Sequence, residues 1–216
     1  MNIKISVAIF ILLSFFNIGA ISNNSILAEN SFSSIEKNAR KISEFEENGV
    51  KLQYKTQDNM ETENVRIIGY LIQNVSGDYK EIQKDQFEIV NKDLDINIKS
   101  WYEDRYTYVE VTIINKNAEY TTKYLKNILE KLENKESEDV QYFLYYEGKG
   151  VTANNNDFMY KFINQNHIEN AQSLEINNGY TGTGYLDNGN KVNFALSKYN
   201  TGSHIIIGTP IIFATY

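Results

Sequence analysis

Apolar residues recur along the chain in two periods, and changes between the periods predict a succession of helices and strands. From 31 to 48 the apolar positions lie three and four residues apart, as on one buried face of a helix: Phe32, Ile35, Ala39, Ile42 and Phe45. Ser33 followed by Glu36 has the spacing of a capping box, and Gly49 stands where a helix C-cap is expected. From 50 to 57 apolar and polar residues alternate, which predicts a half-buried strand.

The same two periods continue through the rest of the chain. Further strands are predicted at 65–73, 94–101 and 105–115, with a hairpin turn at YED between the last two, while 74–92 stays undecided. A second amphipathic helix is predicted at about 119–134, and the charged tract KESED ends it. Then follow a strand at 141–147, a helix at about 155–166, and strands at 171–178, 180–187, 190–199 and 203–214, with Asp187-Asn188-Gly189 as a tight turn.

The predicted elements fall into two halves of similar order, which indicates an internal duplication. We expect an α+β fold in which helices cover one side of an antiparallel sheet in two layers and leave the other sheet face partly open. The first half is placed at 29–135 and the second at 136–216, both within one domain.

The N-terminal region has the pattern of a bacterial signal peptide. Lys4 precedes an uncharged stretch, and the apolar run from Ile5 to Phe16 is shorter than the roughly 20 residues of a membrane span. Small residues offer cleavage positions after Ala20, Ser22 or Ala28. We therefore predict a signal peptide at 1–28 and an exported protein. The alternative is that this segment stays uncleaved as an anchor, and in that case it is the protein's one contact with the membrane.

Composition and charge exclude several classes of function. The sequence has no cysteine, so it lacks disulfides, thiolate chemistry and the lipid-attachment site of a lipoprotein. Its formal net charge is −7, and Lys4 is the only charged residue before Glu29, so the remainder is still more acidic. Because a phosphate backbone is bound by clustered Lys and Arg, nucleic acid is not an expected partner.

The C-terminal sequence HIIIGTPIIFATY (His204 to Tyr216), preceded by NFALSKYN (Asn193 to Asn200), resembles the ending of the YwmB family. The resemblance extends to the signal peptide, the helix that follows it and the glycine-rich segment GYTGTGYL. It implies an exported protein of spore-forming, low-GC Gram-positive bacteria with a duplicated saddle like that of the TATA-box-binding protein. The family has no established biochemical function, so the resemblance supplies no catalytic residues.

No motif in the sequence predicts catalysis, a metal or a cofactor. Tyr180 to Gly184 has the closely spaced glycines of a phosphate loop, but a strand and a turn follow it where a helix would be needed, so a hairpin or bulge is favoured. The two histidines, His167 and His204, have no metal-ligand spacing, and His204 is expected to be a hydrogen-bonded strand residue. Adjacent acids such as Glu46-Glu47 are more typical of a solvated surface than of a glycosidase pair.

Aromatic residues form the most informative set. Alternation places the following on the strand phase opposite the inward aliphatic residues, and so on the open sheet face: Trp101, Tyr106, Tyr108, Tyr145 and Tyr199. With Glu110 and Asn193 they predict a surface that stacks on sugar rings or binds an extended peptide. The hypothesis is a non-enzymatic envelope protein whose partner is an envelope protein or cell-wall glycan. The alternatives are a glycan-directed hydrolase and a purely structural accessory protein.

Overall fold

The computed structural model describes residues 25–151 and 156–214. The predicted signal peptide lies mostly outside this range, since residues 1–24 are not described and residues 25–28 fall in the first helix. Within the described residues, no helix combines the length and apolar character needed to cross a membrane.

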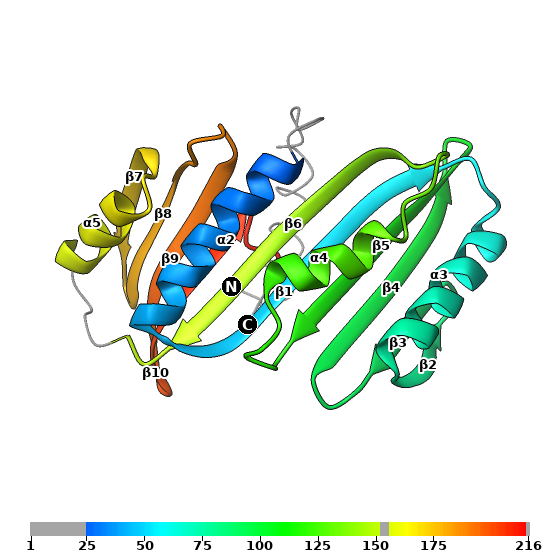
Figure 1. The fold of residues 1–216 in the computed structure, drawn as a ribbon, viewed down its shortest axis with the longest axis horizontal. Helices are drawn as coiled ribbons and strands as arrows, with labels where there is room; N and C mark the ends of the chain where they lie inside the picture. The colour runs from blue at the N-terminus through cyan, green and yellow to red at the C-terminus, as the bar shows by residue number, and fades with distance from the viewer. Residues whose placement is uncertain (1–24, 152–155, 215–216) are drawn as a thin grey trace.

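The described elements are helices and strands of one α+β fold (Figure 1). The helices are α2 (Ser25–Ile42), α3 (Met60–Val75), α4 (Thr122–Glu130) and α5 (Asn156–Gln165). The strands are β1 (Glu44–Thr56), β2 (Asp78–Gln83), β3 (Gln86–Val90), β4 (Leu94–Glu103), β5 (Tyr106–Asn115), β6 (Glu138–Lys149), β7 (Glu169–Ile176), β8 (Gly179–Tyr185), β9 (Lys191–Tyr199) and β10 (Gly202–Thr209).

All these strands join one antiparallel sheet with the order β2-β3-β4-β5-β1-β6-β10-β9-β8-β7. The chain runs through the same series twice, as α2-β1-α3-β2-β3-β4-β5 and then as α4-β6-α5-β7-β8-β9-β10. Within the sheet, the two series are arranged alike on either side of the central β1–β6 pair, with β5, β4, β3 and β2 on one side and β10, β9, β8 and β7 on the other. The helix expected at 119–134 therefore opens the second series as α4, although we expected it to close the first half.

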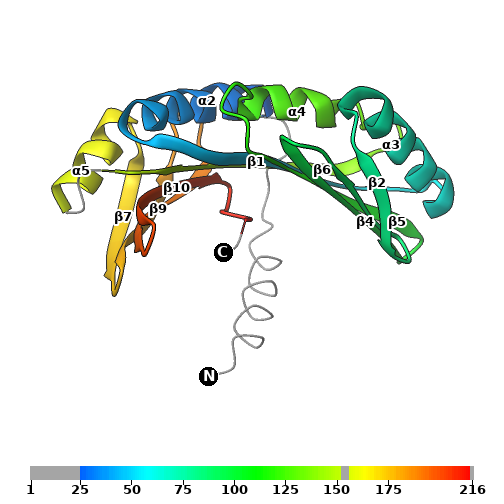
Figure 2. The same cartoon turned by 90° about the horizontal axis from the view of Figure 1, so that it is seen from below.

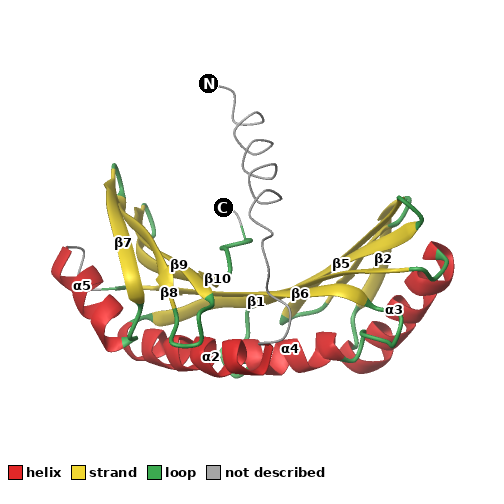
Figure 3. Cartoon of the chain, turned by 90° about the horizontal axis from the view of Figure 1, so that it is seen from above, coloured by secondary structure: helices red, strands yellow, loops and turns green. Residues whose placement is uncertain are grey.

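The four described helices lie against one face of the sheet, and the sheet curves away from them (Figures 2 and 3). The opposite, concave face carries no helix among the described residues. Alternation along the central strands accounts for this arrangement, because the aliphatic phase of each strand turns toward the helices. Examples of this buried phase are Val50 and Leu52 on β1, Val109, Val111 and Ile113 on β5, and Val192, Phe194 and Leu196 on β9.

One predicted strand is wrong, and the first predicted helix ends earlier than expected. The segment 65–73 lies within α3, not in a strand, because Asn59 caps the helix by accepting from the backbone N–H groups of Glu61 and Thr62, while Ile67 and Leu71 are buried at helical spacing. The first helix ends at Ile42 instead of residue 48, so Ser33 lies inside it and Gly49 lies in β1.

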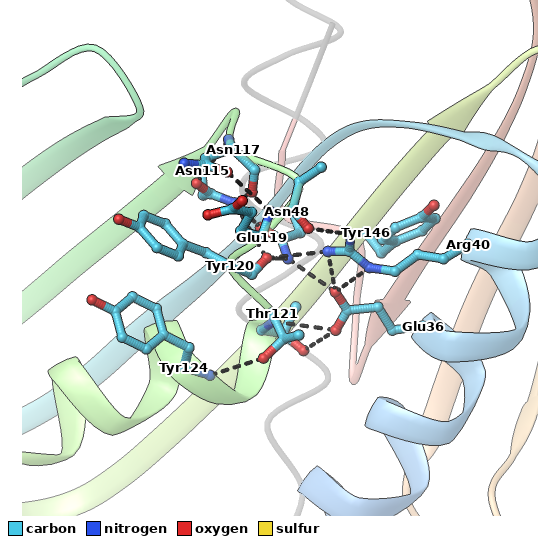
Figure 4. A network of polar contacts seen from close by, with 12 residues as sticks. Glu36, Arg40, Asn48, Asn115, Asn117, Glu119, Tyr120, Thr121, Tyr124 and Tyr146 are labelled. Atoms are coloured by element: carbon cyan, nitrogen blue, oxygen red, sulfur yellow. Dashed lines mark hydrogen bonds and ion pairs between the residues drawn. The ribbon is translucent and has the colours of Figure 1, made fainter.

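A buried polar network joins α2 to the central strands and to the turn before α4 (Figure 4). The Glu36 carboxylate accepts from Arg40, from Asn48 Nδ2 at 3.0 Å, and from both the backbone N–H and the hydroxyl of Thr122, the last at 2.6 Å. Asn48 in turn accepts from Asn115 Nδ2 at 2.8 Å. One carboxylate therefore connects elements of both series at the centre of the fold.

Candidate functional site: the concave sheet face

Trp101 and Tyr108 form a stacked aromatic pair on the concave face. They are directly paired across β4 and β5, and their rings stack 5.4 Å apart with an angle of 9° between their planes. Their neighbours Ser100 and Val109 are buried on the helix side, so both rings point away from the helices. Both residues are partly exposed to solvent.

Two lysines border this stacked pair. Lys99 Nζ lies 5.6 Å from the Trp101 ring centroid, and Lys55 Nζ lies 4.7 Å from the ring centroid of Tyr106, the next open-face residue on β5. Lys55 also forms an ion pair with Asp139 at 2.6 Å. We call Trp101, Tyr106, Tyr108, Lys55 and Lys99 the aromatic patch. It combines ring surfaces with charged hydrogen-bonding groups.

Glu110 lies one open-face position along β5 from Tyr108, and it is held in place by two neighbours on β1. Gln53 Nε2 donates to Glu110 Oε2 at 2.5 Å, and Lys51 Nζ lies 3.5 Å from the same oxygen. The predicted residues Trp101, Tyr106, Tyr108 and Glu110 thus lie together on β4 and β5.

Tyr145 does not form part of an accessible ring surface, contrary to our expectation. It lies on β6 opposite Gly49 of β1, but its side chain is fully buried, with the Phe213 ring 5.7 Å away. Its hydroxyl lies 2.7 Å from Glu147 and 3.1 Å from Glu47. Burial raises the pKa of Glu47; the hydrogen bond from Tyr145 lowers it, and the nearby Glu147 charge raises it again.

Asn193 is likewise engaged within the protein. Its Nδ2 donates to the backbone oxygen of Pro210, just beyond the end of β10. The predicted strand at 203–214 is therefore too long, since β10 ends at Thr209 and the chain then crosses to the concave side (Figure 2). We call residues 210–214 the cover segment.

A series of hydrogen-bonded side chains, which the sequence pattern did not reveal, continues from Tyr145 through Glu147. His204 Nδ1 lies 2.5 Å from Glu147, and its Nε2 lies 3.1 Å from the Thr201 hydroxyl in the β9–β10 turn. The order hydroxyl, imidazole, carboxylate is that of a hydrolase triad. A structural role explains this arrangement more simply. The Glu147 and His204 side chains are both buried, so each needs hydrogen-bond partners and finds them in this series of contacts.

Tyr199, the last of the predicted residues, lies at the far end of β9 from Asn193. Its half-buried ring meets the His204 ring edge-on, 5.1 Å away. Tyr199 is therefore separated from the aromatic patch by the central strands, and the seven predicted residues do not form one continuous surface.

A shallow hollow of about 370 Å³ lies on the second series, over β7, β8 and β9. Its lining is uncharged, and consists of Gln172, Ser173, Leu174, Thr181, Gly182, Thr183 and Asn193. The hydroxyl oxygen of Thr183 is buried there and has no hydrogen-bond partner. The glycine-rich segment of the sequence forms β8 itself, with an antiparallel strand on each side, so it is not a phosphate loop.

The fold and this face together define an α+β protein with a long antiparallel sheet and an aromatic patch on its helix-free side. Comparison with protein-family models and with curated proteins finds no match for this chain. Among residues 25–151 and 156–214, no three histidine, aspartate or glutamate side chains are grouped to hold a metal ion.

Proposed function

We propose that this chain is an exported cell-envelope binding protein whose concave sheet face binds cell-wall glycan. The observation that carries the proposal is the Trp101–Tyr108 stack, which presents two nearly parallel rings on the face away from the helices. Sugar rings offer apolar C–H faces to such surfaces, while their hydroxyl and amide groups need hydrogen-bond partners at the rim. Lys99, Glu110 and Gln53 supply charged and amide groups beside the rings.

The shape of the face supports an extended ligand. The rings of the aromatic patch lie on β4 and β5, and the uncharged hollow lies on β7 to β9, at opposite sides of the central β1–β6 pair. A polymer that follows the concave surface across the strands would reach both. Hydroxyl and amide groups predominate in the hollow, and this chemistry suits neutral sugars better than phosphates.

The finer description of the fold also belongs to this proposal. We infer a two-layered saddle like that of the TATA-box-binding protein, as the YwmB resemblance implies, and the repeated element order and the curved sheet support it. Shared architecture does not imply a shared ligand. The net charge of −7 is unfavourable for binding DNA.

Export is proposed from the N-terminal sequence pattern. A lysine followed by a short apolar run and small residues is the pattern of a signal peptide. The absence of cysteine from the sequence fits a protein that needs no disulfide after export.

Replacing both Trp101 and Tyr108 by alanine is expected to weaken binding to isolated cell-wall sacculi by about 5- to 150-fold, because each of the two lost stacking contacts is worth roughly 0.5–1.5 kcal/mol. The free energy of unfolding is expected to fall by only about 1 kcal/mol, because both rings are partly exposed. Co-sedimentation with sacculi measures the binding, and thermal unfolding measures the stability.

Tyr102→Ala is the matched control, since Tyr102 follows Trp101 on β4, points to the other face and is 66% exposed. We expect this control variant to bind as the original chain does. If the double variant binds sacculi as tightly as the original chain, the aromatic patch is not the binding site.

A second candidate ligand is an extended peptide from an envelope protein. One observation favours it: the centre of the concave face already holds a peptide, the cover segment, against Tyr145 and Asn193. Retention of envelope proteins, but not of purified sacculi, on the immobilised chain would favour the peptide over the glycan.

A further inference from the structure

The cover segment lies across the middle of the concave face. Phe213 packs against the Tyr145 ring at 5.7 Å and lies under Lys51, whose Nζ is 5.4 Å from the Phe213 ring centroid. At its start, the segment is anchored by the hydrogen bond from Asn193 to Pro210. Its five residues are all partly buried, so it is seated on the sheet.

A strand glycine, Gly208, makes room for this segment. A Cβ atom on Gly208 would stand 2.5 Å from the backbone oxygen of Ile211 and 2.7 Å from the Cα of Ile212. Gly208 sits in the middle of the sheet, where glycine is unfavourable, and close approach of a second backbone explains its presence there.

The cover segment contacts residues that border both parts of the proposed binding surface. Lys51, whose Nζ lies over the Phe213 ring, also pairs with Glu110 next to the aromatic patch. Asn193, which holds Pro210, also lines the uncharged hollow. A ligand that spans the two parts must therefore pass through the position of the cover segment.

We infer that the cover segment is a built-in occupant of the centre of the concave face and competes with the ligand for that face. This inference rests on the proposed function. A molecule whose concave face is covered by the segment does not bind a ligand across that face. The apparent affinity therefore equals the intrinsic affinity multiplied by the fraction of molecules in which the face is uncovered. If the segment is seated nine times in ten, its displacement strengthens binding by roughly tenfold.

Gly208→Ala is the sharpest test of this inference. The three heavy atoms nearest to the new methyl group all belong to the cover segment, so the substitution acts against the segment and not against the sheet. Phe213→Ala is the second variant, since it removes the contacts with Tyr145 and Lys51 and leaves every strand residue unchanged. Gly69→Ala is the control, since an added Cβ there meets no atom within 4 Å.

Two readouts separate displacement of the segment from binding. Because the sequence has no cysteine, Ala214→Cys gives one labelling site for an environment-sensitive fluorophore at the end of the segment. We expect Gly208→Ala and Phe213→Ala to move this label into a more solvent-like environment. We also expect both variants to bind sacculi about three- to tenfold more tightly than the original chain and than Gly69→Ala.

Each outcome assigns failure to one claim. If the label moves and sacculi binding is unchanged or weaker, while replacement of Trp101 and Tyr108 by alanine still weakens binding, competition by the cover segment is refuted and the proposed function stands. If the label does not move in either variant, the segment is a fixed part of the sheet and the inference is wrong. If the segment is displaced in the variants and none of them binds sacculi, both the inference and the proposed function fail.

Discussion

Glu36→Ala is expected to lower the free energy of unfolding by about 3–5 kcal/mol, because it removes the common acceptor of the central polar network. The side chain is 2% exposed and accepts from Arg40, Asn48 and Thr122, which belong to α2, β1 and the start of α4. Alanine removes the acceptor that these donors share, and Asn48 and Thr122 are both buried, so the lost hydrogen bonds are not readily replaced by water. For a chain of this size, the loss corresponds to a decrease in melting temperature of roughly 10 °C.

Two further variants give this prediction its controls. Glu119→Ala removes an exposed carboxylate near the same network and is expected to change stability by less than about 0.5 kcal/mol. Glu36→Gln keeps the shape and one acceptor oxygen, so an intermediate loss is expected. Urea denaturation of the three variants measures the effect, and a loss for Glu36→Ala no greater than that for Glu119→Ala would contradict the role given to this network.

Gly179→Ala is expected to cost about 2–5 kcal/mol, since backbone strain and overpacking act together. Gly179 opens β8 with a φ of +152°, a conformation that residues with a side chain rarely adopt. An added Cβ would stand 1.8 Å from the backbone oxygen of Leu196 on the paired strand β9. The β7–β8–β9 part of the sheet would have to separate to admit the methyl group.

Gly69→Ala, in contrast, is expected to stabilise the protein by about 0.5–1 kcal/mol, because Gly69 lies inside α3 and alanine is the better helix former. The two glycine substitutions therefore have opposite expected signs in the same thermal unfolding experiment. A stable, normally folded Gly179→Ala variant would show that β8 is not held against β9 as described.

The sequence predicted elements well where one period dominated. The alternation of β4, β5 and β9 identified the buried phase correctly, with Val109, Val111 and Phe194 on the helix side. It failed at 65–73, because the run VRIIGYLI places apolar residues at helical and at strand spacing alike. The local signal that favoured a helix was Asn59, whose side chain caps α3 six residues before the apolar run begins at Val65.

The candidate site was predicted only in the part that depends on local pattern. Strand phase was enough to place Trp101 and Tyr108 on the face away from the helices. It could not show that Tyr145 is covered, because the covering residue, Phe213, is distant in sequence. Pro210 was the available signal, since a proline cannot donate to the next ladder hydrogen bond and often ends a strand.

Buried acidic residues were the largest omission. Glu36 and Glu63 are both 2% exposed or less, although carboxylates are rarely buried without partners. Glu63 is paired with Arg66 at 2.7 Å and accepts from the Tyr54 hydroxyl at 2.5 Å. The pKa of Tyr54 is raised above its ordinary value by burial first and then by this hydrogen bond to the carboxylate. Arg66 lies on the same helix as Glu63, but Tyr54 comes from β1, and single-sequence periodicity does not reveal a partner on another element.

Trp101 provides the most direct test of the binding face, because it is the only tryptophan in the sequence and lies within the aromatic patch. Its fluorescence should be followed while soluble cell-wall fragments are added to the original chain and to Tyr108→Ala. The account predicts a saturable change in Trp101 emission for the original chain, and a much weaker response for the variant. Fragments that bind the chain, as measured by calorimetry, without altering Trp101 emission would show that the ligand site lies elsewhere.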